Sequence, residues 1–401
     1  MKANLRHAAG SLMVVGLGGT ELTGLERAWL KLVRPAGVIL FRRNIADARQ
    51  TRALLDEATA LCASNSFRCV DVEGGTVDRL RDALAPMPSA QAVAVAARRI
   101  DLGSRIPTHS QRTRMDGAPA GSSTPLRFAQ NDRAPNGNAL IREHGELIAR
   151  GVRAFGFNTT LAPVIDLAQP ESAGVMGTRT AGATAEDVVS YAREFLAGLA
   201  AHNVVGCGKH FPGLGGGVLD SHLETPAIHR KISELWLEDL LPYIELVNEL
   251  PMVMVNHASY PQTLSKNLPA SVSRYWIQNI LRKRIEYRGL VFSDDLEMGG
   301  ILKFMSIEET AVAAIRAGMN LIEICHSPEL ILRAYEALIA EGERSAAFAK
   351  LLIDRARETE RQCAKLFASG VPAALTAKQF EALRGRILSF SERVAKTQES
   401  A

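Results

Sequence analysis

The chain has 401 residues, of which 47% are hydrophobic and 22% are charged, a composition typical of a globular protein with a large core. Its net charge of +4 is too small to indicate nucleic-acid binding, and no apolar run approaches the roughly 20 residues that a membrane helix needs. The five cysteines form no C-x-x-C pair, so we expect free thiols in the reducing cytoplasm.

The first 19 residues place two basic residues before a short apolar stretch, a pattern that also occurs in signal peptides. We interpret residues 11–17 instead as the first strand, because a helix-like acidic segment follows them. No small-residue cleavage site precedes a new domain. This interpretation again predicts a cytoplasmic protein.

Short apolar runs alternate with longer helical patterns along most of the chain. The predicted strands are residues 11–17, 37–41, 67–72, 157–164, 204–208, 252–256, 289–293 and 320–325. Most are continuously apolar, which is typical of parallel strands buried on both faces. The helical patterns between them include residues 46–64, 139–154, 184–202, 232–248, 271–286 and 306–317. This order predicts an α/β fold, a (β/α)8 TIM-type barrel, over an open doubly wound sheet.

Two segments do not fit the alternating pattern. Residues 101–136 are rich in Ser, Thr, Pro, Gly and Arg and have little periodicity, so they predict a loop insertion. Residues 344–393 are helical and amphipathic, and we expect them to pack outside the barrel or to mediate association. The predicted organisation is a barrel domain at residues 1–340 and a C-terminal helical extension at 341–401.

Polar residues follow several predicted strands, at the end of the barrel where catalytic residues cluster in this fold. They are Asp71, Glu73 and Arg79 after the third strand, Arg179 after the fourth, Lys209 and His210 after the fifth, Asn256 and His257 after the sixth, and Asp294 and Asp295 after the seventh. Carboxylates accept hydrogen bonds from hydroxyl groups, and Arg and Lys donate to them, so the set indicates a sugar site. We expect Asp294 to face the anomeric carbon and Asp295 to cap a helix beginning at Leu296.

A second catalytic candidate lies in the run KHFPGLGGGVLDSHLETP, residues 209–226. Asp220 and His222 are two residues apart on a glycine-rich loop. Asp220 can orient the imidazole of His222 and stabilise its charged form, while the glycines allow the loop to move over a substrate. The pair is therefore a candidate proton donor.

These motifs resemble glycoside hydrolase family 3, and within it the bacterial single-domain β-N-acetylglucosaminidases (β-N-acetylhexosaminidases) of peptidoglycan recycling. The matching pieces occur in the family's order over roughly residues 10–330, and they are GVILFRRNI, VDVEGGTVDRL, TLAPVIDL, VMGTRTAG, KHFPGLGGGVLDSHLETP, VMVNHASYP and GLVFSDDLEM. Three positions depart from the common pattern: Val72 replaces Gln, Thr178 replaces Asp and Leu214 replaces His.

The resemblance implies a retaining exo-hydrolase that removes terminal N-acetylglucosamine from muropeptide fragments through a covalent glycosyl-enzyme. It implies that Asp294 is the nucleophile and that His222 is the acid/base, assisted by Asp220. The residues that would hold the sugar are Asp71, Arg79, Arg179, Lys209 and His210. We expect a small carbohydrate as the substrate and no cofactor, metal, nucleic acid or membrane, with a monomer or a dimer as the oligomeric state.

Four alternatives stay open. The same family includes β-glucosidases, and an imidazole acid, neutral after proton donation, also suits phosphate as the acceptor in a phosphorylase. The three departures from the pattern are compatible with a catalytically impaired sugar-binding protein. A metal-dependent hydrolase could use His210, His222, His229, His257 and the Asp294–Asp295 pair as ligands, although no H-x-H spacing is present.

Overall fold

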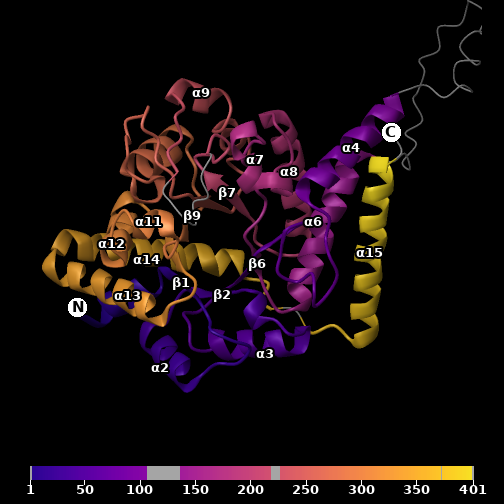
Figure 1. The fold of residues 1–401 in the computed structure, drawn as a ribbon. Coiled ribbons are helices and arrows are strands. Elements are labelled where there is room, and N and C mark those ends of the chain that lie inside the picture. The colour runs from indigo at the N-terminus through magenta and orange to yellow at the C-terminus, as the bar shows by residue number, and fades with distance from the viewer. Residues whose placement is uncertain (1, 106–135, 218–225, 372, 400–401) are drawn as a thin grey trace, which may run out of the picture.

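The computed structural model describes residues 2–105, 136–217, 226–371 and 373–399. A parallel sheet of eight strands lies at the centre and helices surround it (Figure 1). Each strand overlaps one of the predicted runs, and the strands are β1 (Met13–Gly16), β2 (Gly37–Leu40), β3 (Phe67–Val70), β6 (Thr159–Thr160), β7 (Cys207–Phe211), β8 (Met252–Val255), β9 (Leu290–Asp295) and β10 (Leu321–Ile324).

The sheet closes on itself. Its strand order is β6-β3-β2-β1-β10-β9-β8-β7, and all the paired neighbours are parallel. Two isolated parallel bridges, Thr159 with Val205 and Val164 with Lys209, join the two ends of this order. The closure confirms the predicted (β/α)8 barrel and excludes the open sheet.

Every predicted helical pattern contains a helix. The main helices are α1 (Lys2–Gly10), α2 (Gly24–Val33), α3 (Ala48–Thr59), α4 (Ala90–Arg105), α6 (Gly137–Ala154), α8 (Ala185–Ala201), α9 (Ile232–Leu237), α10 (Leu241–Glu245), a π-helix at Tyr275–Arg284, α12 (Ile307–Ala317), α13 (Pro328–Arg344), α14 (Ala346–Leu366) and α15 (Ala377–Glu399). Local chemistry explains several starts: the side chains of Thr184 and Ser306 accept hydrogen bonds from the backbone N–H of Asp187 and Glu309. No helix in the described ranges is long and apolar enough to cross a membrane.

Two predicted boundaries were wrong. Residues 2–10 form the helix α1, whereas the sequence pattern indicated no element before residue 11. Helix α4 extends to Arg105, so the first residues of the predicted loop 101–136 are helical, because α4 packs against α6 and α15. Residues 106–135 lie outside the described part of the chain.

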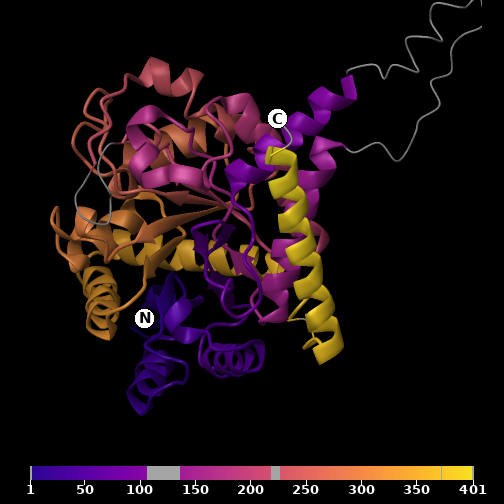
Figure 2. The ribbon, with the colours of Figure 1, turned by 45° about the vertical axis from the view of Figure 1, so that its right-hand side comes forward.

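The C-terminal helices pack against the barrel at two places. Helix α15 lies along α4 and α6 (Figure 2). The end of α14 contributes Cys363 and Phe367 to the apolar cluster formed by the barrel's inward-facing side chains. The ring of Phe367 meets that of Phe67, near the start of β3, edge-on at 4.9 Å between centroids. The N-terminal end of the barrel is therefore filled with apolar side chains.

Candidate active site

A cavity of about 500 Å³ opens at the C-terminal ends of the barrel strands. The six described residues to which the family resemblance gives a role in catalysis or sugar binding all line it, and they are Asp71, Arg79, Arg179, Lys209, His210 and Asp294. The other two, Asp220 and His222, lie outside the described residues. The lining also includes Phe41, Leu214 and Met254, so charged groups and apolar surface share the cavity, as in many sugar sites.

A buried ion-pair network forms one wall of the cavity. Glu73 lies on the hairpin of β4 (Val72–Gly74) and β5 (Val77–Asp78), which follows β3. Its carboxylate accepts two hydrogen bonds from Arg179, from Nε and from Nη2, both at 2.8 Å, and pairs with Lys209 Nζ at 2.6 Å. Burial alone would raise the pKa of Glu73, but the charges of Arg179 and Lys209 hold that pKa well below its ordinary value. All three groups are therefore charged at neutral pH.

Asp71 extends this network toward the cavity. Lys209 Nζ lies 3.3 Å from Asp71 Oδ1, and Arg79 Nη2 lies 3.7 Å from Asp71 Oδ2. The side chains of Asp71 and Arg79 are partly exposed to the cavity, in contrast to the buried Lys209. Burial opposes the charge on Lys209, but Glu73 and Asp71 raise its pKa above the ordinary value. Asp71 and Arg79 thus present an acceptor and a donor to the cavity, and Lys209 holds Asp71 from behind.

His210 is held by Asp166, a residue that the sequence analysis missed. The Asp166 Oδ2 atom lies 2.6 Å from His210 Nδ1 and also accepts the His210 backbone N–H, while Oδ1 accepts the N–H of Leu214 at 2.7 Å. Arg179 Nη2 lies 3.4 Å from His210 Nε2, so we assign the proton to Nδ1 and the acceptor to Nε2. Asp166 comes just after the predicted strand 157–164, as Asp294 comes after the predicted strand 289–293. The sequence pattern that pointed to Asp294 therefore also pointed to Asp166.

Asp294 lies in β9, and its Oδ1 accepts the backbone N–H of Asp295 at 3.0 Å. Burial by itself would raise the pKa of Asp294, but the nearby imidazoles of His210 and His257 and the ammonium of Lys209 outweigh it, and the pKa lies below its ordinary value. The side chain is therefore an anion at the edge of the cavity, which suits attack on an electrophilic carbon.

Asp295 does not cap a helix at Leu296, contrary to the prediction. It is the last residue of β9, and the next helix, α11 (Gly299–Leu302), begins after Met298. Asp295 Oδ1 accepts the backbone N–H groups of Glu297 at 3.0 Å and Cys325 at 3.2 Å. The carboxylate therefore joins the end of β9 to the residue that follows β10. This contact forms only when the two strands lie side by side in the barrel.

The polar residues after β8 have structural partners. His257 Nδ1 lies 2.7 Å from Ser271 Oγ, and its Nε2 lies 3.0 Å from the carbonyl oxygen of Asp295. Asn256 donates to the carbonyl of His210 at 2.9 Å. His210 and His257, two of the ligands considered for a metal-dependent hydrolase, are thus held by protein groups, and the geometry gives that hypothesis no support.

Glu323, on β10, is a second cavity residue that the sequence analysis missed. The side chain is 2% exposed, and its Oε1 atom has no hydrogen-bond partner. Burial raises the pKa of Glu323 well above its ordinary value, and the negative charges of Asp295, Asp71 and Asp294 raise it further. The carboxyl therefore keeps its proton to a higher pH than an exposed glutamate does. A lone glutamate within the apolar run 320–325 was a visible signal.

The variant Glu323→Gln tests this protonation state. The pKa of Glu323 is higher in the folded than in the unfolded chain, so its contribution to stability is complete below the ordinary value of 4.5 and decreases as the pH rises. Glutamine mimics the protonated form and does not titrate. The variant therefore avoids the decrease in folding stability with pH, which amounts to roughly 1.4 kcal/mol per pH unit. We expect the variant to melt at a higher temperature than the wild type, by a margin that widens between about pH 5 and pH 8.

Thermal unfolding followed by circular dichroism across that pH range measures the margin. Glu381→Gln, which changes an exposed glutamate on α15, is the control and should show no such trend. A margin that stays constant with pH would contradict a protonated Glu323.

Comparisons with known proteins agree with this geometry. The model of the "Glycosyl hydrolase family 3 N terminal domain" matches residues 5–356. The chain is 30% identical over 337 residues to a Beta-hexosaminidase of Idiomarina loihiensis, which covers 84% of this chain and 90% of that protein. The structure of a family 3 β-N-acetylglucosaminidase from a Paenibacillus species superposes with a TM-score of 0.78 at 27% identity, covering 96% of this chain and 68% of the other.

A further solved structure is NagZ from Neisseria gonorrhoeae in complex with N-trifluoroacetyl-D-glucosamine. It superposes with a TM-score of 0.68 at 26% identity and covers 95% of this chain and 97% of the other. The match of the family model over most of the chain agrees with the barrel and with the acidic cavity at its C-terminal end. The chain belongs to glycosyl hydrolase family 3, and it is a glycoside hydrolase.

Proposed function

We propose that the chain is a retaining exo-β-N-acetylglucosaminidase that removes terminal non-reducing N-acetyl-β-glucosaminyl residues. The observation that carries this proposal is the placement of Asp294. It is an anionic carboxylate at the end of β9, lining one cavity with Asp71, Arg79, Lys209 and other polar groups. Relatives named Beta-hexosaminidase support the choice of sugar.

In the first step, a carboxylate oxygen of Asp294 attacks the anomeric carbon as the bond to the leaving oxygen breaks. His222 gives its proton to that oxygen, and Asp220 stabilises the imidazolium beforehand. In the second step, His222 takes a proton from water, whose oxygen attacks the same carbon and releases Asp294. Two inversions at one carbon leave the product with the β-configuration.

The fixed polar groups of the cavity account for sugar binding. Asp71 and His210 Nε2 can accept hydrogen bonds from hydroxyl groups, and Arg79, Arg179 and Lys209 can donate to them. Arg179 and Lys209 are anchored by Glu73, and His210 is anchored by Asp166, so little ordering of these groups is needed when the sugar binds. A solved relative binds N-trifluoroacetyl-D-glucosamine, and we propose the corresponding N-acetyl sugar for this cavity, on muropeptide fragments in the cytoplasm.

Proton NMR of the reaction with an aryl N-acetyl-β-glucosaminide tests the proposal. We expect the β-anomer of N-acetylglucosamine to appear first, followed by slow mutarotation, and no comparable turnover of the matching β-glucoside. The α-anomer as first product would contradict the two-step mechanism. Faster release from the glucoside would indicate a β-glucosidase, a sugar 1-phosphate formed only with added phosphate would indicate a phosphorylase, and tight binding without turnover would indicate a sugar-binding protein.

The variant His222→Ala tests the proposed acid. Loss of the proton donor should slow glycosides with poor leaving groups by about 10² to 10⁴-fold, because those need protonation most. Dinitrophenyl glycosides leave without a proton and should lose much less in the first step. Steady-state rates over a series of aryl glycosides give the dependence on leaving-group pKa. An equal loss across the series would assign the proton donor to another residue.

A further inference from the structure

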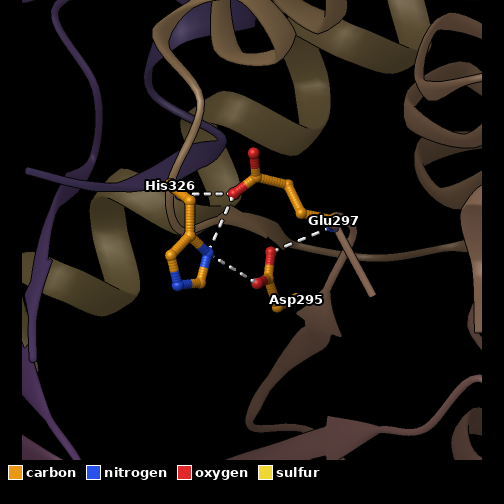
Figure 3. A group of neighbouring side chains, drawn as sticks. All are labelled: Asp295, Glu297 and His326. Carbon is orange, nitrogen blue, oxygen red and sulfur yellow. Dashed lines mark hydrogen bonds and ion pairs between the residues drawn. The ribbon is translucent and has the colours of Figure 1, made fainter. Parts of the chain in front are cut away.

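Three side chains converge where the ends of β9 and β10 meet, beside the cavity. Asp295 ends β9, Glu297 follows two residues later, and His326 follows β10 in the turn before α13 (Figure 3). Asp295 and His326 line the catalytic cavity. The Asp295 and Glu297 side chains are largely buried, whereas His326 is 58% exposed. The group therefore combines two buried carboxylates with an accessible imidazole.

The distances within this group suit a metal ion better than a hydrogen bond. His326 Nδ1 lies 3.3 Å from Glu297 Oε2 and 3.5 Å from Asp295 Oδ2, beyond the ~2.7–2.9 Å of a charge-assisted hydrogen bond. A tetrahedral ion with bonds of ~2.1 Å holds its ligand atoms ~3.4 Å apart. One potential ligand atom from each of the three residues lies within 4.8 Å of the others. The two imidazole–carboxylate separations therefore match the spacing of ligands around a zinc ion.

Other contacts hold the two carboxylates in place. Asp295 Oδ1 accepts the backbone N–H groups of Glu297 and Cys325, so its Oδ2 faces the imidazole. Glu297 Oε1 accepts the N–H of Ser327 at 2.7 Å, and Oε2 accepts the N–H of His326. The imidazole stacks on the ring of Phe41 at 5.4 Å between centroids. Such supporting contacts are typical of metal sites, because they fix ligand orientation before binding.

A further buried acid lies next to this group. Glu323 is paired in register with Asp295 on the neighbouring strand. Its buried Oε1 has no partner, although buried carboxylate oxygens are almost always hydrogen-bonded. It lines the same cavity as Asp295 and His326. The site thus has an additional oxygen donor close by.

We propose that Asp295, Glu297 and His326 form a binding site for a divalent transition-metal ion, with Zn²⁺ as the best match. One imidazole nitrogen and two carboxylate oxygens suit zinc, whereas magnesium and calcium prefer oxygen alone. Three protein ligands leave a coordination position for water or for a ligand oxygen on the cavity side. The inference rests on these contacts and not on the proposed reaction.

Isothermal titration of the metal-free protein with ZnCl₂ tests the site. We expect one zinc ion per chain, and weakening of at least ~10–100-fold in His326→Ala and in Glu297→Gln. The matched control is His7→Ala, which removes an exposed histidine that faces a single carboxylate, Glu360, at 2.7 Å, and it should bind as the wild type does. MgCl₂ and CaCl₂ should give little heat.

Two further measurements identify the zinc ligands without an activity assay and check that the variants are folded. X-ray absorption of the zinc-loaded protein should show a first shell of nitrogen and oxygen with one imidazole, and the melting temperatures of the metal-free variants should match the wild type within a few degrees. Binding that survives His326→Ala and Glu297→Gln but disappears in Asp294→Asn would overturn the assignment, since the ion would then sit on the catalytic carboxylate. Absence of zinc binding at millimolar concentration would also overturn it.

Discussion

Asp294→Ala should lower kcat for an aryl N-acetyl-β-glucosaminide by on the order of 10⁴ to 10⁶-fold, the loss typical of removing a covalent nucleophile. The neighbouring carboxylate of Asp295 cannot replace that of Asp294, because its Oδ1 accepts hydrogen bonds from the backbone N–H groups of Glu297 and Cys325. The carboxylate of Asp294 is held as an anion by the ammonium of Lys209 and the two imidazoles near it, so alanine removes both the attacking atom and its charge.

Release of the aryl group measured by absorbance gives kcat and KM for the variant. Sodium azide provides a sharper test, because a small anion that enters the space left by the carboxylate should restore part of the rate and yield the α-glycosyl azide. Asp354→Ala, which removes an exposed carboxylate paired with Lys350 on α14, is the matched control and should keep wild-type kinetics. Near-normal turnover by a correctly folded Asp294→Ala protein would end the assignment.

Glu73→Gln should cost roughly 3–5 kcal/mol of unfolding free energy at pH 7, because it leaves Arg179 and Lys209 as buried cations without their shared carboxylate. Glutamine preserves the shape of the side chain but not its charge. Lys209 and Arg179 also lose the group that positions them, so kcat/KM should decrease by about 10²-fold.

Urea unfolding at several pH values measures this contribution. The pKa of Glu73 is lower in the folded chain than its ordinary value of 4.5, so the stability that it supplies is present above that value and is lost as the pH falls toward the folded pKa. The gap between wild type and variant should therefore shrink below about pH 4. Glu57→Gln, which breaks the exposed pair with Arg27, is the control and should leave the free energy of unfolding almost unchanged. A similar cost for both variants would contradict the buried network.

Several parts of the site could be predicted from the sequence because they depend on local order. Buried parallel strands appear as short apolar runs, and in a barrel their C-terminal ends meet at one face. The residues that follow those runs, among them Asp71, Lys209, His210 and Asp294, were therefore expected together, and they line one cavity. The capping residues Thr184 and Ser306 were predictable for the same reason, since a cap depends on its own first turn.

Other features depend on which elements become neighbours. Asp295 looked like a helix cap, but the adjacent end of β10 offers it the N–H of Cys325. The start of the 101–136 segment is helical because α6 and α15 cover α4.

The sequence alone thus determined the barrel, the glycosidase family and most of the polar groups that line the cavity, because the apolar runs and the polar residues at their ends follow one another along the chain. Only the closed barrel decided that Glu73 lies between Arg179 and Lys209, that Asp166 supports His210, and that His326 meets Asp295 and Glu297. These partners are distant in sequence, and the closed hydrogen-bonded sheet and the packing around it bring their side chains within a few ångströms.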